Sequence, residues 1–183
     1  MTKSFDERAK EERAPIQYRI YKGISGKNGA LRLNLKRPYA NQNPKKSEGV
    51  IFLEAAAAIG RNEYDWDNKI IIALSIVDIP KIILYLRSPN HSVFDRSDGK
   101  LKLIHDKGAG TAKKGQEVKT LEIAKSERTS NFMFNVYESS NGTNKSASIP
   151  VSPDEVIAIG TLLQAAIPVI MAWTEGPPMA DML

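Results

Sequence analysis

Basic and aromatic side chains alternate with apolar ones in two segments near the start of this 183-residue chain. Residues 16–22 and 30–37 both follow the period of two that is typical of β-strands, which gathers their polar residues on one face. Cations on such a face can replace the counterions of a phosphate backbone, and aromatic rings offer flat surfaces to unstacked bases. The candidate site on these strands and their connecting hairpin consists of Arg19, Tyr21, Lys22, Lys27, Arg32 and Lys36.

Positive charge is concentrated in two blocks of the chain. The formal net charge is +5, yet residues 1–48 hold 12 basic and 5 acidic residues, and residues 100–128 hold 8 and 4. The two remaining blocks are each net negative. A polyanionic partner would explain this distribution, and an ordinary solvated surface would explain it as well.

Two further aromatic residues and two further lysines join the candidate site. Tyr64 and Trp66 lie in the polar segment 61–68, an unusual place to leave two rings without a partner. Lys102 and Lys119 lie at strand positions that we expect to face outward. These lysines either extend the binding surface or are simply solvated.

Some aromatic residues are better explained by packing. Phe132 and Phe134 share one strand face with Val136, and Tyr18 alternates with isoleucines, so we expect these residues in the core.

No pattern in the sequence indicates an enzyme or a metal site. The chain has no cysteine, and its two histidines, His91 and His105, are far apart. The glycines of segment 23–29 join two strands instead of forming a phosphate-binding loop, and no nucleophile motif occurs. Asp65 and Asp67 could form a metal pair, but a capped polar turn explains them better. We predict no catalysis, no cofactor and no metal.

Eight strands and two helices are expected, in two groups of four strands with one helix after each group. Sheets with one polar face and few parallel crossovers indicate an antiparallel α+β fold. A short strand at 92–95 is a further possibility. The expected strands are residues 16–22, 30–37, 49–58, 69–74, 100–105, 118–125, 131–138 and 147–151, and the first helix begins at Ser75.

The second helix is expected from Ser152 to about Trp173. Ser152 and Glu155 form a capping box, with a proline at the first helical position between them. The helix is apolar around nearly its whole circumference and could just span a bilayer, but a glycine, a glutamine and a proline interrupt it. We expect one face to pack on the protein's own sheet and the other on a neighbouring subunit. The residues assigned to this oligomerisation are Ile159, Leu163, Ile167, Ile170 and Trp173.

The two ends of the chain differ from the domain between them. We expect residues 1–15 to form a charged N-terminal arm, 16–174 to form the folded domain, and 175–183 to form a flexible tail. The tail is mildly acidic, so it could dock a protein partner or simply be disordered. No apolar signal core or transit-peptide composition is seen, which predicts an intracellular, soluble protein without a targeting peptide.

Four stretches of the sequence, taken in order, resemble the Whirly family of single-stranded DNA-binding proteins. The resemblance covers residues 16–174. The family's Tyr-Lys-Gly-Lys-Ala-Ala-Leu segment is split here by three extra residues, 24–26. The matching stretches are Ile20-Tyr21-Lys22-Gly23 with Lys27 and Ala30-Leu31; Tyr64-Asp65-Trp66 with Ile72-Ala73-Leu74-Ser75-Ile76 and Ile79; His105-Asp106; and Ile149-Pro150-Val151 with Pro168, Ile170, Met171 and Trp173.

The resemblance implies a particular architecture and function. It implies two four-stranded antiparallel sheets packed crosswise, and helices that gather four subunits into a pinwheel tetramer. It also implies single-stranded DNA lying along the sheets and between subunits, without sequence specificity, in replication, recombination or repair. Two alternative functions stay open, because stacking surfaces and positive charge do not distinguish them from single-stranded DNA binding. They are an RNA-binding or annealing module and a transcription-associated scaffold protein.

Overall fold

The structure is a computed structural model that describes residues 17–21, 28–36, 49–111, 113 and 115–171. Nine strands, two α-helices and one 3₁₀ helix are found in these ranges. In chain order they are β1 (Gln17–Tyr21), β2 (Gly29–Lys36), β3 (Val50–Gly60), β4 (Glu63–Tyr64), β5 (Ile70–Leu74), α2 (Asp78–Arg87), η1 (Ser92–Ser97), β6 (Leu101–Asp106), β7 (Glu117–Lys125), β8 (Phe132–Ser140), β9 (Thr143–Val151) and α3 (Pro153–Ile170).

The first sheet is antiparallel and is organised around the long strand β3. β2 pairs with one edge of β3 and carries β1 on its far side, whereas β5 and β4 pair with β3 at different heights along it. The four expected strands are therefore present. The two-residue β4 is an addition inside the segment that was expected to be a turn, and Asn62, with a φ of 61°, closes the tight connection to it.

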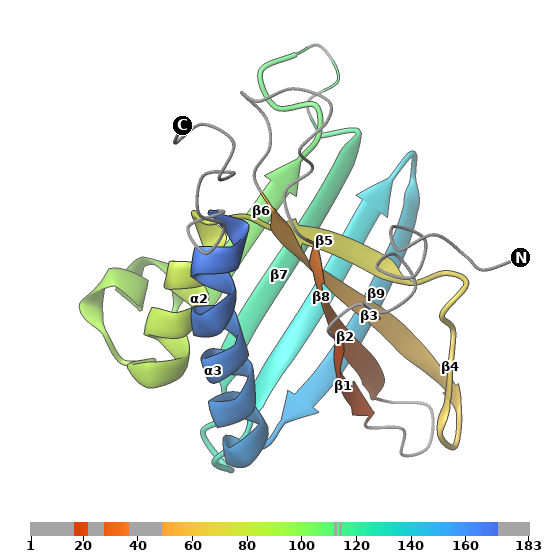
Figure 1. The fold of residues 1–183 in the computed structure, drawn as a ribbon. Helices are drawn as coiled ribbons and strands as arrows, with labels where there is room; N and C mark the ends of the chain where they lie inside the picture. Colours follow the sequence, from red (N-terminus) through yellow and green to blue (C-terminus); the bar gives the residue numbers. More distant parts are fainter. Residues whose placement is uncertain (1–16, 22–27, 37–48, 112, 114, 172–183) are drawn as a thin grey trace, which may run out of the picture.

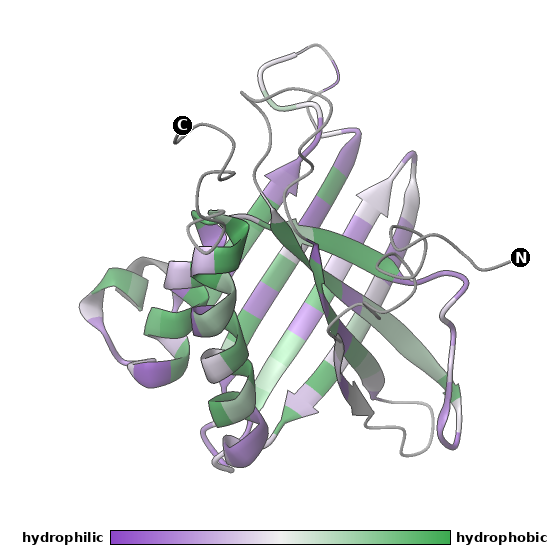
Figure 2. Cartoon of the chain, viewed as in Figure 1, coloured by the Kyte–Doolittle hydropathy of each residue, from purple (hydrophilic) through white to green (hydrophobic). Residues whose placement is uncertain are grey.

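The second sheet is a four-stranded meander, β6-β7-β8-β9, in which every neighbouring pair is antiparallel. Asn141 and Gly142 join β8 to β9 with positive φ angles of 48° and 80°. This is the backbone conformation that two-residue hairpins favour. Hydrophobic and hydrophilic residues alternate along these strands, as Figure 2 shows.

The two sheets cross each other, and both helices lie side by side at one side of them (Figure 1). One hydrophobic core contains side chains from both sheets and both helices. Phe132 and Phe134 are buried in it, and Tyr18 packs against it, as predicted. At Gly29 the packing is so close that an added Cβ would lie 2.5 Å from the carbonyl oxygen of Ala56. The fold class expected from the sequence is confirmed.

Side-chain hydrogen bonds stabilise the N-terminal ends of both helices. The Glu155 carboxylate accepts from the backbone N–H and the hydroxyl of Ser152 at 2.8 Å, which confirms the predicted capping box. The Asp78 carboxylate likewise accepts from the N–H and the hydroxyl of Ser75. However, α2 begins at Asp78 and not at Ser75, because two turn residues separate them.

The possible strand at residues 92–95 is wrong, since η1 occupies this segment. His91 precedes it, and its Nδ1 accepts a hydrogen bond from the N–H of Val93. Phe94 is buried and lies edge-on to Tyr85, with ring centroids 4.8 Å apart. Anchoring of Phe94 in the core and local side-chain bonds favour the compact turn over an extended strand.

The long helix α3 buries one stripe and leaves the rest of its surface outside the core. Ile159, Leu163 and Ile170 are at most 1% exposed, because they face the chain's own core. Assigning these three to a subunit contact was therefore wrong. Ile167 is partly buried against the core, and Trp173 lies outside the described residues.

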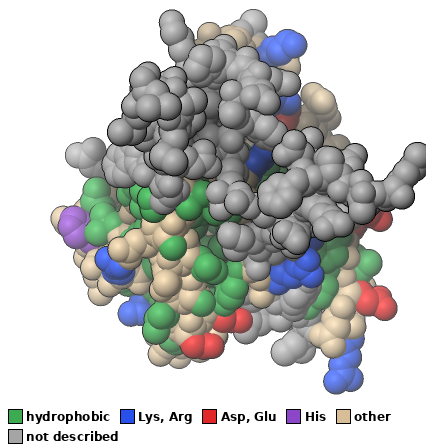
Figure 3. Space-filling view, in the orientation of Figure 1, with side chains coloured by type: hydrophobic (Ala, Val, Ile, Leu, Met, Phe, Trp, Pro, Cys, Tyr) green, Lys and Arg blue, Asp and Glu red, His purple; other side chains and the backbone are tan. Residues whose placement is uncertain are grey.

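The side of α3 that faces away from the core is also largely apolar. Ile157 is 71% exposed and Leu162 is 36% exposed. Figure 3 shows hydrophobic side chains (green) on the visible part of this helix, beside tan atoms of the backbone and other side chains. With 18 residues and a mean hydropathy of 1.4, α3 is also long and apolar enough to cross a membrane. Its buried stripe nevertheless belongs to the core of the two-sheet domain.

Candidate nucleic-acid interface

The outer face of the first sheet carries the described cations of the candidate site. Arg32 and Lys36 alternate with core leucines in β2, and Arg19 in β1 is exposed and lies opposite Arg32 in the strand register. Their predicted outward orientation is confirmed. Three further predicted residues lie outside what the structure describes, namely the side chain of Tyr21 and the whole of Lys22 and Lys27.

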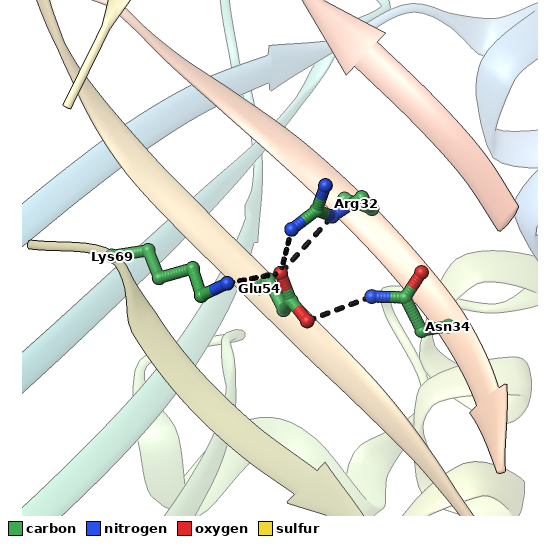
Figure 4. A network of polar contacts seen from close by, with 4 residues as sticks. All are labelled: Arg32, Asn34, Glu54 and Lys69. Carbon is green, nitrogen blue, oxygen red and sulfur yellow. Dashed lines mark hydrogen bonds and ion pairs between the residues drawn. The ribbon is translucent and has the colours of Figure 1, made fainter. Parts of the chain in front are cut away.

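A nearly buried carboxylate lies among these cations (Figure 4). Glu54 on β3, directly opposite Arg32 in register, is only 8% exposed. Its Oε2 accepts from Nε of Arg32 at 3.0 Å and also from Nη2, and Nζ of Lys69 lies 3.2 Å from the same oxygen. Its Oε1 accepts from Nδ2 of Asn34 at 2.8 Å. The predicted groove cation Arg32 is therefore already half of an ion pair.

The surroundings of Glu54 keep it ionised. Burial by itself would raise the pKa of this carboxyl, but hydrogen bonds and charges from Arg32 and Lys69 outweigh burial. The net result is a pKa below the ordinary value of about 4.5. Two cations and one anion leave this cluster with one net positive charge.

The flat face of Arg32 lies against an aromatic ring. Its guanidinium carbon is 4.6 Å from the ring centroid of Trp66, which is within the range of a cation–π contact. Trp66 is held by a braced turn. The N–H of Asp65 donates to the carbonyl of Ala57, and the Asp65 carboxylate accepts from the backbone and side-chain nitrogens of Asn68. These bonds confirm the predicted capped turn.

Tyr64 ends the short strand β4 and is half-buried. It pairs with Ala58 of β3 in register. Tyr64 and Trp66 thus lie on one short segment at the end of the first sheet, and the segment is tied to β3 and not left as a free loop.

A second cation lies beside a second ring on the same face. Nζ of Lys36 is 5.5 Å from the ring centroid of Phe52, which is half-buried on β3. Phe52 pairs in register with Ala73, and Glu54 pairs with Ile71, so these side chains share the outer face. Apolar surface, two cation–ring contacts and the Glu54 cluster thus occupy one continuous face.

The second sheet holds its predicted lysines differently. Lys102 points outward, opposite Glu122 in register, and its Nζ lies 3.5 Å from one carboxylate oxygen. Lys100 lies 3.5 Å from the other oxygen. Both lysine side chains are at least 40% exposed, and this arrangement is typical of a solvated surface pair.

Lys119 lies on the opposite face from Lys102. It has the same alternation as Leu121 and Ile123, whose side chains are fully buried, so it points to the inner side beyond the end of the core. Its Nζ is 3.6 Å from the carboxylate of Glu138. The expectation that Lys119 faces outward is wrong, and its spacing from Leu121 and Ile123 was a sequence signal that indicated the inner face.

Sequence reasoning missed several residues that shape these faces. Glu54 is a single acid within the apolar run of β3, and that isolation was the available signal. Phe52 and Ile71 were expected only as strand residues and not as part of the site, although they lie on the outer face. On the second sheet, Ile104 and Tyr137 are 65% and 41% exposed.

Among the residues that the structure describes, no group of three His, Asp or Glu side chains could hold a metal ion. Asp65, one member of the imagined metal pair, is engaged with Asn68.

Comparison with known proteins places the chain among its relatives. Residues 20–162 match the profile of the family described as "Whirly transcription factor". The chain is 26% identical over 169 residues to "Single-stranded DNA-binding protein WHY1, chloroplastic" of Zea mays, and 26% identical over 161 residues to the Solanum tuberosum protein with the same description. The matches cover 91% and 86% of this chain but only 60% and 55% of those proteins.

Solved structures with the same fold include WHY1 and WHY3 from Arabidopsis thaliana. Their TM-scores are 0.73 and 0.72, at 21% and 22% identity, and each match covers 88% of this chain and 88% or 92% of the other. A more distant neighbour is described as "Structure of a guideRNA-binding protein complex bound to a gRNA", with a TM-score of 0.55, 11% identity and coverage of 92% and 98%. The profile match spans most of the described domain, and we conclude that this chain belongs to the Whirly family.

Proposed function

We propose that this chain binds single-stranded DNA without sequence preference, along the outer face of the first sheet. The observation that carries the proposal is the pairing of cations with rings on that face, Arg32 with Trp66 and Lys36 with Phe52. Cations attract phosphates whatever the sequence, and rings and flat apolar surface accept any unstacked base. The maize and potato relatives, described as single-stranded DNA-binding proteins, support the same function.

The proposed role is in replication, recombination or repair, where single strands are exposed. Both relatives are described as chloroplastic, and the chain spans less than two thirds of their length, so its location in the cell stays a prediction. Docking of a protein partner by the tail, residues 175–183, also stays a prediction, because the tail lies outside the described residues.

RNA binding is the second candidate, and one observation favours it. The guide-RNA-binding neighbour shares the fold, although at 11% identity it shows only the fold. A flat face with rings and cations does not distinguish the ribose of RNA from the deoxyribose of DNA. Only contacts to the 2′-hydroxyl would distinguish them. The transcription-associated alternative draws support from the family description "Whirly transcription factor" and from a neighbour described as the "plant transcriptional regulator PBF-2".

Competition at fixed salt tests the proposed function. A labelled thymidine strand of about 30 nucleotides is displaced by unlabelled single-stranded DNA, by duplex and by RNA of matched sequence. Duplex should compete roughly tenfold less well or worse, because its bases are stacked inside the helix and offer no faces to the rings. Equal competition by duplex would contradict the proposal, and equal competition by RNA would favour the second candidate.

We also propose that the chain assembles as a homotetramer through the outer side of α3. Only 28% of the helix is buried within the chain, and Ile157 and Leu162 remain exposed. Light scattering should report about four chains per particle. Tetramers are a common closed assembly of identical subunits. Ile157→Asp should dissociate the assembly without unfolding the subunit, whereas Ile159→Asp should unfold it, because Asp would lose water inside the core. A monomeric wild-type protein would contradict the assembly.

A further inference from the structure

Glu54 is unexpected on a face that we propose to bind a polyanion. Its negative charge cancels one of the two positive charges of Arg32 and Lys69 and would repel a nearby phosphate. An exposed acid could be explained as ordinary surface, but Glu54 is only 8% exposed. It also contacts three polar side chains: Arg32 and Asn34 of the neighbouring strand β2 donate hydrogen bonds to it, and Lys69, in the segment before β5, forms an ion pair with it.

The contacts of Glu54 determine how Arg32 is presented. Oε2 accepts from both Nε and Nη2, so the carboxylate holds one edge of the guanidinium group. A planar guanidinium that is held by its edge keeps its two flat faces available for stacking. One of these faces lies against Trp66, whose ring centroid is 4.6 Å from the guanidinium carbon.

Trp66 is fixed from the other side of this contact. Asp65, its neighbour, is bonded through its N–H to Ala57 of β3, and through its carboxylate to Asn68. The N–H of Trp66 also donates to the carbonyl of Tyr64 at 2.9 Å. The turn that carries Trp66 is therefore held to β3, the Arg32 guanidinium is held by Glu54, and the ring and the guanidinium meet at one contact.

We propose that Glu54 is a positioning residue that holds Arg32 against Trp66, so that the first sheet presents a preassembled arginine–tryptophan pair on which a nucleobase stacks. The inference rests on the proposed single-strand binding and names the element that does the stacking. Guanidinium planes and aromatic rings both accept unstacked bases. A long arginine side chain that is already ordered loses less conformational entropy when the base arrives.

The proposal and plain electrostatics predict opposite signs for Glu54→Gln. This change keeps the size of the side chain and removes one negative charge from the face. If only charge matters, binding of a thymidine strand tightens and its salt dependence steepens. If Glu54 positions the pair, binding weakens by roughly three- to tenfold at every salt concentration, since part of one stacking contact is lost.

Glu122→Gln is the matched control on the second sheet. Glu122 also lies opposite a lysine in register and also holds two cations, Lys100 and Lys102. No cation–ring contact with a described ring is found at either lysine. Its removal should therefore tighten binding slightly or leave it at the wild-type level. A loss as large as that of Glu54→Gln would overturn the positioning role.

One further variant keeps the test decisive if Glu54→Gln unfolds, and a second tests whether Glu54 acts through Trp66. Arg32→Lys retains the charge but loses the planar fork, so it should weaken binding with an unchanged salt slope. In a Trp66→Leu background, Glu54→Gln should lose its weakening effect or tighten binding. If Glu54→Gln weakened strand binding by the same factor in the Trp66→Leu background, Glu54 would not act through the Arg32–Trp66 contact. That result would overturn the proposal.

The outcomes separate this inference from the proposed function. If wild type prefers single strands and Trp66→Leu weakens binding, but Glu54→Gln tightens it, only the positioning role is overturned. If wild type binds duplex as well as single strands, both fail. Circular dichroism and thermal melting of each variant check that the fold is retained.

Discussion

Both sheets contain a cross-strand ion pair on their outer face, but the surroundings of the two pairs differ. Each places a basic residue directly opposite a glutamate in the strand register, Arg32 with Glu54 and Lys102 with Glu122. The two glutamate side chains are similarly covered, at 10% and 15% exposed, but the side chains of Arg32 and Lys69 are only 21% and 29% exposed, whereas those of Lys100 and Lys102 are 40% and 42% exposed. Only Arg32 also lies against a described aromatic ring, that of Trp66. We infer that a cross-strand ion pair fixes the position of its side chains only where these side chains are shielded from water and held by further contacts.

Stability should show the largest contrast. Glu54→Ala should lower the free energy of unfolding by about 2–3 kcal/mol, because Arg32 and Lys69 lose their shared acceptor in a poorly solvated place. Glu122→Ala should lower it by less than about 1 kcal/mol, since exposed pairs contribute little. Urea unfolding of both variants measures the two values. Equal losses would remove the distinction between the sheets.

Strand binding should show the next largest contrast. Trp66→Ala should weaken binding of a thymidine strand by about 1–3 kcal/mol, with the salt slope nearly unchanged, because a stacking surface is lost and no charge is removed. Tyr137→Ala, on the second sheet, should have less effect than Trp66→Ala, because no described cation lies over this ring. Fluorescence anisotropy across a salt series compares them. A larger loss for Tyr137→Ala would move the site to the second sheet.

The pH dependence of stability should sharpen the contrast at Glu54. Arg32 and Lys69 lower the folded-state pKa of Glu54, so its stabilisation is present above the unfolded-state value of about 4.5. The stabilisation is lost as the pH falls through the lower folded-state pKa. The stability difference between wild type and Glu54→Gln should therefore shrink as the pH falls from neutral to below the unfolded-state value. A difference that stays constant over this range would contradict the role of ionised Glu54.

The smallest effect is expected from the two lysines that lie on opposite faces of the second sheet. Lys102→Gln should make the salt slope of strand binding shallower by at most about 0.7, the value for one phosphate contact. Lys119→Gln should leave the slope unchanged, because Lys119 points inward and contacts Glu138. The same salt series provides the measurement. A shallower slope for Lys119→Gln alone would place the strand on the inner side.

Much of the fold could be predicted because it depends on local patterns. Alternation of leucines with polar residues identified β2, and the Ser152–Glu155 box identified the start of α3. The strand predicted at residues 92–95 was wrong, because burial of Phe94 and local hydrogen bonds outweighed the weak strand preference of this segment. The outward cations Arg32, Lys36 and Lys102 followed from period two, and Lys119 was misplaced although the same period was available.

By itself, the sequence determined the principal strands, the capping box of α3 and the outward faces of Arg32, Lys36 and Lys102, because these depend on neighbours a few residues apart. Only the tertiary structure decided that Glu54 meets Arg32, 22 residues away, and that Trp66 lies against the same guanidinium. It also decided that Ile159 and Leu163 face the chain's own core while Ile157 stays outside. Strand register and the crossing of the sheets set these contacts, and no local pattern specifies either of them.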